Sequence, residues 1–288
     1  MIELLSSSLP IWLGVVFLYS LLIGSFLNVV ILRLPARIEH DWKLQVNEFL
    51  EQPELDLEAP PDLVFGRSAC PHCGHQITAL ENIPLVSYLF LRGKCSNCSA
   101  PISAQYPVVE AVTALLSVIV AWRFGFTWAA GFAMALTWAL VALSVIDIRE
   151  QLLPDVITLP ALWAGLLLNT AGVFTDLTSA VIGAAAGYLS LWLVYHLFKL
   201  ATGKEGMGYG DFKLLAVFGA WLGWQILPLV ILLSSLVGAV VGIGLIIFAG
   251  KDRNIPIPFG PYIAAAGWLA MIWGERIIGT YLEFSGLS

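Results

Sequence analysis

Two aspartates stand beside long uncharged stretches of this sequence. Asp147 directly follows an apolar run that ends at Ile146, and Asp211 follows the glycine-rich string GMGYG shortly before another apolar run. A carboxylate in such a place is costly to desolvate unless it is paired or takes part in chemistry. Two carboxylates that meet could share one proton, so that one activates water while the other hydrogen-bonds a carbonyl. Asp147 and Asp211 are therefore the candidate catalytic residues.

Structural roles for the two aspartates remain open at this point. Asp147 could pair with Arg149, and Asp211 could cap a helix next to Lys213. The three glycines at 206, 208 and 210 favour chemistry, because a backbone without Cβ atoms lets an extended peptide approach closely. That property suits a proteolytic cleft, although alternating glycines could also form only a flexible turn.

The chain has four cysteines, in two C-x-x-C pairs: Cys70, Cys73, Cys95 and Cys98. Two such pairs at this separation are typical of a zinc ribbon, in which four thiolates bind one structural Zn²⁺ and leave no position for water. Two disulfides are the competing interpretation, which a reducing cytosolic location disfavours. His72 and His75 could replace a thiolate, but we expect them to be exposed loop residues.

The elements that must position these groups are membrane helices. Of the 288 residues, 59% are hydrophobic and only 12% are charged, which excludes an ordinary soluble domain. A helix needs about 20 mostly apolar residues to cross the hydrocarbon core. Uncharged runs of that order predict spans at Leu4 to Leu32, Phe124 to Ile146, Val156 to Thr175, Leu177 to Phe198, Leu214 to Gly250 and Ile255 to Gly274.

Two further features bring the predicted number of spans to about eight. The stretch from Tyr106 to Trp122 adds a span that contains one carboxylate, Glu110. The 37-residue run from Leu214 to Gly250 is too long for one helix and should fold back between Gly223 and Pro228. The first run lacks a basic leader and a cleavage site, so we interpret it as a retained anchor. The predicted fold class is an all-α polytopic membrane protein.

The distribution of basic residues predicts the orientation. With the amino terminus outside, one face collects six basic residues from the short loops, and the other face collects Arg123 and Arg276. By the positive-inside rule the first face is cytosolic, and both candidate aspartates lie at that boundary. The prediction has three parts: a first transmembrane helix at 1–34, a cytosolic zinc-ribbon-like loop domain at 35–104, and a bundle of about seven helices at 105–288.

An acidic segment precedes the cysteines. It contains Glu39, Asp41, Glu48, Glu51, Glu54, Asp56, Glu58 and Asp62 against one lysine, Lys43. Such a run is usually a solvated, mobile linker, and the prolines at 53, 60 and 61 agree with that interpretation. The same charges could attract a basic peptide.

Six blocks of this sequence, in order, resemble the bacterial type IV prepilin leader peptidases. They are GSFLNVVILRLP at 24–35, the cysteine pairs with ENIPLVSYLFLRGKC at 81–95, ISAQYPVVE at 102–110, IDIREQLLPD at 146–155, GMGYGD at 206–211 and PFGPYIAAAG at 258–267. The resemblance covers nearly the whole chain. It implies that Asp147 and Asp211 are the catalytic aspartates of a membrane aspartic protease, and that Cys70, Cys73, Cys95 and Cys98 bind structural zinc.

The resemblance also implies substrates and a second activity. Members of this family cleave prepilins and type II secretion pseudopilins, which places this chain in the bacterial inner membrane. Together with the orientation predicted above, the amino terminus would lie in the periplasm and the active site at the cytosolic face. Family members then transfer a methyl group from S-adenosylmethionine to the new amino terminus, often a phenylalanine. No glycine motif in a βαβ unit identifies residues for the methyl donor, so these remain unassigned. The lipid bilayer is an expected partner, and no nucleic acid is expected.

Alternative functions remain open on the sequence alone. The enzyme could be a peptidase without methyltransferase activity. A transporter with a zinc-ribbon loop would also have about eight spans and broken helices, but its charges should lie near the middle of the membrane. A zinc-ribbon scaffold of a secretion machine would need the cysteines but not the aspartates. A presenilin-like protease also uses a Gly-x-Gly-Asp site, but the other sequence blocks argue against it.

Overall fold

The computed structural model describes residues 6–51, 59–249 and 257–285, and these residues form helices with no named strand. The predicted all-helical fold is confirmed for them. The chain divides into two compact units, Met1–Ala142 and Leu143–Ser288.

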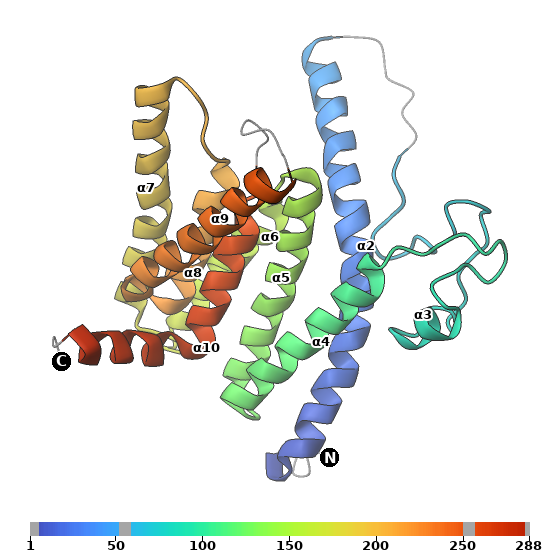
Figure 1. The fold of residues 1–288 in the computed structure, drawn as a ribbon, viewed down its shortest axis with the longest axis horizontal. Helices are drawn as coiled ribbons and strands as arrows, with labels where there is room; N and C mark the ends of the chain where they lie inside the picture. Colours follow the sequence, from blue (N-terminus) through green and yellow to red (C-terminus); the bar gives the residue numbers. More distant parts are fainter. Residues whose placement is uncertain (1–5, 52–58, 250–256, 286–288) are drawn as a thin grey trace. The chain divides into compact units, whose positions relative to one another are not determined.

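The N-terminal unit is built on two packed helices. It contains α2 (Leu9–Phe49), α3 (Val86–Phe90), α4 (Gln105–Phe124) and most of α5 (Trp128–Glu150). In Figure 1, α4 crosses α2, and the loop that carries α3 lies beside both. Gly24 permits this crossing, because a Cβ atom there would lie 2.7 Å from the Cα atom of Glu110. Trp138 of α5 donates a hydrogen bond from Nε1 to Ser117 Oγ of α4 at 2.9 Å.

The first helix continues well beyond the predicted first span. It passes through Pro35 and ends at Phe49, so the boundary predicted after residue 34 falls inside a helix. The prediction of a mobile linker is therefore wrong for residues 39–49. Lys43 and Glu39, one helical turn apart, form an ion pair of 2.7 Å that favours the helix. Glu54, Asp56 and Glu58 of the acidic segment lie outside the described residues.

The C-terminal unit contains the end of α5 and five further helices. They are α6 (Asp155–Asn169), α7 (Leu177–Thr202), α8 (Tyr209–Leu222), α9 (Leu227–Ala249) and α10 (Gly260–Ser285), with the 3-10 turn η1 (Trp224–Ile226) between α8 and α9. The predicted break between Gly223 and Pro228 is confirmed, since α8 ends at Leu222 and α9 begins at Leu227. Gly223 has a φ angle of 84°, which glycine adopts without strain.

Close packing of α7 on α8 fixes the helix that carries Asp211. Gly183 and Gly219 face each other across this contact, and a Cβ atom on Gly219 would overlap the carbonyl of Gly183. One turn further along α7, a Cβ atom on Gly187 would lie 2.8 Å from the carbonyl oxygen of Leu215. Small residues at these positions let the two backbones touch, as in membrane helix pairs generally.

Asn169 shortens α6 relative to the predicted span. Its side chain donates to the carbonyl oxygens of Ala220 and Trp221 at 2.8 and 3.0 Å, and accepts from the backbone N–H groups of Phe174 and Thr175 at 2.9 and 3.1 Å. These four hydrogen bonds end the helix early and attach the following turn to the end of α8. The predicted span from 156 to 175 therefore becomes a helix of 15 residues, about 22 Å long.

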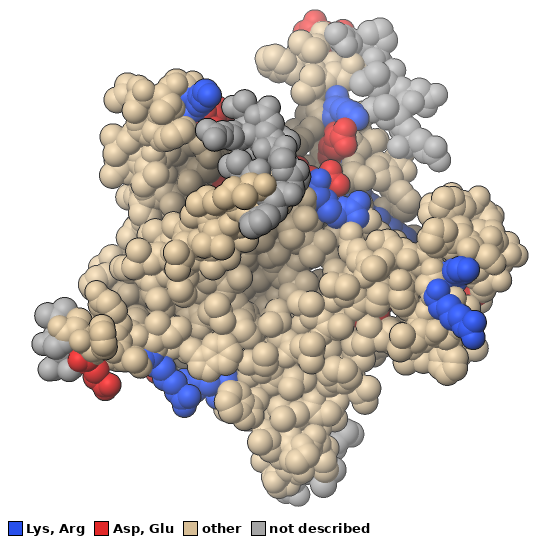
Figure 2. All heavy atoms as spheres, viewed as in Figure 1, with Lys and Arg blue, Asp and Glu red and all other residues tan. Residues whose placement is uncertain are grey.

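Five helices among the described residues are long and apolar enough to cross a membrane, against about eight expected spans. They are α2, α4, α5, α7 and the stretch Trp224–Leu245. Two further helices are short, since α6 has 15 residues and α8 has 14. Large apolar side chains such as Leu167, Leu232 and Leu18 are 65–69% exposed, and the face shown in Figure 2 has few charges over its helices. Such a surface suits lipid rather than water.

Candidate active site and metal centre

Asp211 lies in the first turn of α8. The helix begins at Tyr209 after Gly208, whose extended backbone accepts a hydrogen bond from the Asp211 N–H at 3.2 Å. Tyr209 packs against Tyr195 of α7 and against Phe212, with ring centroids 5.3 and 5.2 Å apart. These contacts fix the start of the helix, and the Asp211 side chain is only 6% exposed.

Asp147 lies in the last turn of α5 and is 5% exposed. The backbone N–H of Gly260, the first residue of α10, donates a hydrogen bond to Asp147 Oδ2 at 3.0 Å. The N-terminus of a helix carries unpaired N–H groups and a partial positive charge, so it orients and stabilises a carboxylate. Asp147 is therefore held by an element 113 residues away in the sequence.

The structure brings the two aspartates together around Leu153. A Cβ atom built on Gly210 would lie 2.7 Å from Leu153 Cβ, and one built on Gly260 would lie 3.1 Å from both Leu153 methyl groups. Leu153 thus separates the glycine that precedes Asp211 from the glycine that holds Asp147. Both aspartates are therefore held next to the same leucine side chain, Asp147 through Gly260 and Asp211 through Gly210. The predicted convergence of Asp147 and Asp211 is present in the described fold.

Gly260 is the positioning residue that sequence analysis missed. It lies in the block PFGPYIAAAG, which drew attention only as part of a resemblance. A Cβ atom at this position would lie 2.7 Å from Asp147 Oδ2, so the backbone can approach the carboxylate only where the side chain is absent. The signal available in the sequence is a glycine directly before Pro261 at a predicted helix start, and it does not reveal which residue the glycine contacts.

We expect Gly260→Ala to reduce peptide cleavage by roughly 100-fold, because displacing a reactive group by about 1 Å has an effect of that size. The methyl group would push Asp147 out of position or break its hydrogen bond. Cleavage of a substrate peptide by the purified variant checks this. Gly279→Ala, in the same helix and with no atom within 4 Å of the new methyl group, is the matched control. Equal activities of the two variants would show that Gly260 does not position Asp147 for cleavage.

The basic residues near the aspartates have other partners. Arg149 Nε lies 3.7 Å from Glu150 Oε1, and Lys213 Nζ lies 2.7 Å from both carboxylate oxygens of Asp155. The N-cap of α8 is Gly208, so Asp211 does not cap this helix, and Asp147 accepts a hydrogen bond from the backbone of Gly260. The N-cap of α6 is Pro154, and the ion pair of Asp155 with Lys213 joins α6 to α8.

Asp155→Asn should leave most of the cleavage activity intact. The ion pair with Lys213 is about half exposed on the Asp155 side, and such pairs contribute about 0–1 kcal/mol to stability. Thermal unfolding and cleavage of the variant check this expectation. A complete loss of cleavage with normal folding would make Asp155, and not one of the two buried aspartates, the reactive carboxylate.

The four cysteines meet in the loop of the N-terminal unit. Their Sγ atoms all lie within 4.8 Å of one another, with 3.8 Å between Cys70 and Cys98 and 4.0 Å between Cys73 and Cys95. A tetrahedral zinc ion with Zn–S bonds of about 2.3 Å requires sulfur atoms about 3.8 Å apart. All four thiols are free. The cluster therefore has the donor set and spacing for one zinc ion, with no disulfide.

The two cysteine pairs form matching turns. Cys70 N–H donates to His75 O and Gly74 N–H to Cys70 O, both at 2.9 Å. The second turn repeats these bonds, from Cys95 N–H to Ala100 O at 2.8 Å and from Ser99 N–H to Cys95 O at 3.0 Å. Gly74 and Ser99 occupy the same place in the two turns, with φ angles of 69° and 59°. Each turn directs two sulfur atoms to one point.

Glu81 connects the two cysteine turns through hydrogen bonds, although it is not one of the four candidate metal ligands. It accepts hydrogen bonds from Ser96 Oγ and from the N–H and hydroxyl of Thr78, and lies 3.3 Å from His75 Nε2. The bond from Ser96, followed by those from Thr78, lowers the pKa of Glu81 to about 2. His75 therefore contacts Glu81, and His72 is exposed. Neither histidine belongs to the group of side chains that could hold a metal ion, which consists of the four cysteines.

Two family models match successive parts of the chain. The bacterial peptidase A24 N-terminal domain matches residues 18–124, and the type IV leader peptidase family matches residues 134–243. No solved structure shows significant similarity to this chain.

Three curated relatives are named prepilin leader peptidase/N-methyltransferase. The protein of Pseudomonas aeruginosa is 59% identical over 269 residues, 93% of each chain. That of Aeromonas hydrophila is 58% identical over 96% of this chain and 97% of its own, and that of Stutzerimonas stutzeri is 55% identical over 99% of both. With both family matches and this similarity along nearly its full length, the chain belongs to the type IV leader peptidase family.

Proposed function

We propose that this protein cleaves the leader peptides of type IV prepilins and type II secretion pseudopilins, and then N-methylates the new amino terminus. The observation that carries the peptidase activity is the pair of buried aspartates, Asp147 and Asp211, held on either side of Leu153 by separate helix ends. The relatives named above support both activities.

The proposed cleavage uses the two carboxylates as an acid and a base. Two neighbouring carboxylates cannot both ionise cheaply, so they hold one proton between them. The ionised aspartate removes a proton from water, and the protonated one hydrogen-bonds the scissile carbonyl. The hydroxide adds to the carbonyl carbon, and the leaving amine takes a proton from the dyad. Gly208 leaves open space beside Asp211, since no atom lies closer than 4.0 Å to a Cβ atom built there, and an extended substrate backbone could approach at this position.

We place this site at the cytosolic face of the bacterial inner membrane. The excess of basic residues in the short loops on one side supports an orientation with the amino terminus in the periplasm. In that orientation the loop domain at 35–104 and both aspartates lie where a basic leader meets the apolar helix of a pilin. A transporter is less well supported, because both aspartates lie at helix ends and not near the middle of a span.

The cysteine cluster is proposed to hold one structural zinc ion. The sulfur spacing and the matched turns of residues 70–75 and 95–100 support this assignment. Bound there by four thiolates, zinc would supply no catalytic position for water, but would join the two turns. The thiolates of Cys70, Cys73, Cys95 and Cys98 would together supply the four ligands that a structural zinc ion needs.

The methyl transfer requires S-adenosylmethionine, which supplies an electrophilic methyl group on a sulfonium. Attack by the new amino terminus would form the C–N bond while the C–S bond breaks, and would give S-adenosylhomocysteine and one proton. Incubation of the purified protein with a prepilin and labelled S-adenosylmethionine, followed by mass spectrometry, tests both activities. We expect a product shortened by the leader and heavier by one methyl group. A shortened but unmethylated product would leave only the peptidase.

A further inference from the structure

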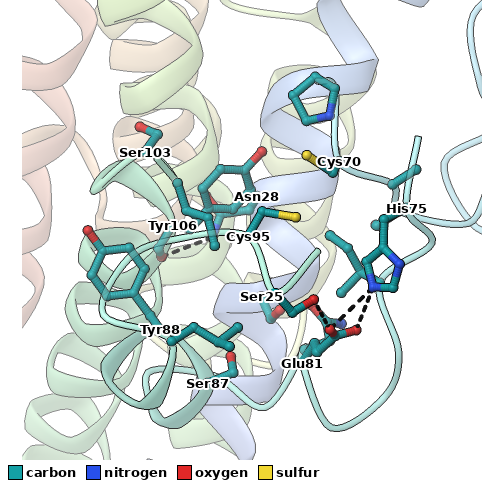
Figure 3. Close-up of a pocket in the computed structure, with 18 of the residues that line it drawn as sticks. Ser25, Asn28, Cys70, His75, Glu81, Ser87, Tyr88, Cys95, Ser103 and Tyr106 are labelled. Atoms are coloured by element: carbon teal, nitrogen blue, oxygen red, sulfur yellow. Dashed lines mark hydrogen bonds and ion pairs between the residues drawn. The ribbon is translucent and has the colours of Figure 1, made fainter. Parts of the chain in front are cut away.

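The N-terminal unit contains a pocket that the peptidase chemistry does not use. Its volume is about 450 Å³, within the range of small-molecule sites. It lies between α2, the start of α4 and the loop that carries the cysteines, and residues from all three line it (Figure 3). The side chains of Tyr88 and Tyr106, with Val29, Leu32 and Ile102, give it an aromatic and apolar part.

Asn28 presents an unpaired acceptor at this pocket. The residue is only 2% exposed, and its Nδ2 group donates to the carbonyl oxygens of Tyr106 and Gly24 at 3.1 and 3.3 Å. Because both neighbours are acceptors, the amide must point its nitrogen toward them and its oxygen away from them. Asn28 Oδ1 is then buried with no hydrogen-bond partner. A buried acceptor without a donor is unfavourable, so it marks a place where a ligand donor fits.

The charged groups of the pocket favour a ligand with positive charge. Arg33 does not serve as an anion site, since its guanidinium donates to the backbone carbonyls of Asp62, Gly66 and Arg67. Glu81 is occupied by its contacts with Thr78, Ser96 and His75. Glu110 remains: it lines the pocket, is 7% exposed, and accepts a hydrogen bond from Leu85 N–H at 2.8 Å.

We propose that this pocket binds the methyl donor, an adenosyl sulfonium compound. The inference rests on the proposed methyl transfer and gives it a location. An adenine ring suits the tyrosine and aliphatic part of the wall, and the ligand's amino and hydroxyl groups are the donors that Asn28 Oδ1 lacks. The ammonium and sulfonium charges are compatible with Glu110 and with the Arg33 guanidinium, which is already bonded to backbone carbonyls.

The test is equilibrium binding of radiolabelled S-adenosylmethionine to the full chain in detergent. We expect Glu110→Gln and Asn28→Ala each to weaken binding roughly tenfold or more, the loss typical of a buried hydrogen bond to a charged or unpaired group. Gln at 110 can still accept from Leu85 N–H, so it removes charge with little change of shape. Glu283→Gln, an exposed position near the end of α10, is the charge-matched control. Retained zinc and an unchanged unfolding temperature verify that each variant is folded.

A second measurement needs no variant. Ultraviolet cross-linking of labelled S-adenosylmethionine to the wild-type protein, followed by peptide mapping, should label peptides that contain residues 25–33, 68–82 or 87–110. Labels confined to residues 143–288 would overturn the proposal.

Three further results would also overturn the proposed pocket, and they differ in whether the proposed methyl transfer fails with it. If the wild-type protein binds the methyl donor and the variants bind it equally well, the pocket is wrong but the methyl transfer stands. If the variants instead weaken only the binding of prepilin leader peptide, the pocket belongs to the substrate. If the wild-type protein neither binds the methyl donor nor methylates cleaved pilin, the proposed methyl transfer fails together with the pocket.

Discussion

Asp147→Asn and Asp211→Asn will each abolish prepilin cleavage, with a fall of at least roughly 100-fold, the lower end for the loss of a positioned acid or base. Asparagine keeps the shape of the side chain, and its carbonyl at 147 can still accept the hydrogen bond from Gly260 N–H. It cannot hold or release the proton that the two carboxylates share. The measurement is leader removal from a purified prepilin, followed by mass spectrometry.

Two readouts separate lost chemistry from lost structure. Both variants should retain their zinc, because the cysteines lie in the N-terminal unit and the aspartates in the other one. Asp176→Asn is a further carboxylate control: Asp176 caps α7 by accepting from Ser179 N–H at 2.9 Å, and asparagine caps helices about as well. Substantial cleavage by either active-site variant would exclude that aspartate from the mechanism.

The sequence predicts the parts of the site that depend on short-range patterns. The two C-x-x-C turns follow from local spacing, and they repeat the same backbone hydrogen bonds in the structure. The break between Gly223 and Pro228 could be predicted because the uncharged run around it is longer than one membrane-spanning helix. The meeting of Asp147 and Asp211 follows from topology, since alternating spans return the chain to the same side of the membrane.

The sequence does not predict contacts between groups that are far apart along the chain. Asn169 ends α6 by binding carbonyls 51 and 52 residues away, and hydropathy continues through that point without a signal. Gly260 reaches Asp147 from 113 residues away. Lys213 forms an ion pair with Asp155, 58 residues away in the sequence.

The long first helix has a different explanation. Hydropathy marks only the part of a helix that lipid surrounds, so it predicted an end near Leu32. Beyond that point α2 is held by polar contacts, such as the 3.3 Å ion pair between Arg37 and Asp62. A proline at 35 usually interrupts a helix, but here the helix passes through it.

Replacing Cys70 and Cys98 by serine should remove zinc and unfold the loop that carries the cysteines. Between residues 59 and 104 the only buried residue is Pro84, and Phe65, Phe90 and Leu80 are 90, 84 and 78% exposed. So small a segment without a core gains little from burial, whereas structural zinc contributes about 10–16 kcal/mol in zinc-finger peptides. Elemental analysis should find about one zinc per wild-type chain and none in the variant, as a four-thiolate site requires.

The expected effect on function distinguishes the metal from the aspartates. Cys70 and Cys95 line the pocket proposed for the methyl donor, so loss of the metal should abolish binding of labelled S-adenosylmethionine. Cleavage should fall through poorer docking of the substrate or faster degradation of the enzyme, and not through the chemical block expected for Asp211→Asn, because neither aspartate lies in the loop. If the wild-type protein contains no zinc, and non-reducing digestion shows its cysteines joined as disulfides, both the metal and the cytosolic placement of the loop are wrong. Four thiols in a reducing compartment bind metal, whereas the same four in the periplasm would be oxidised.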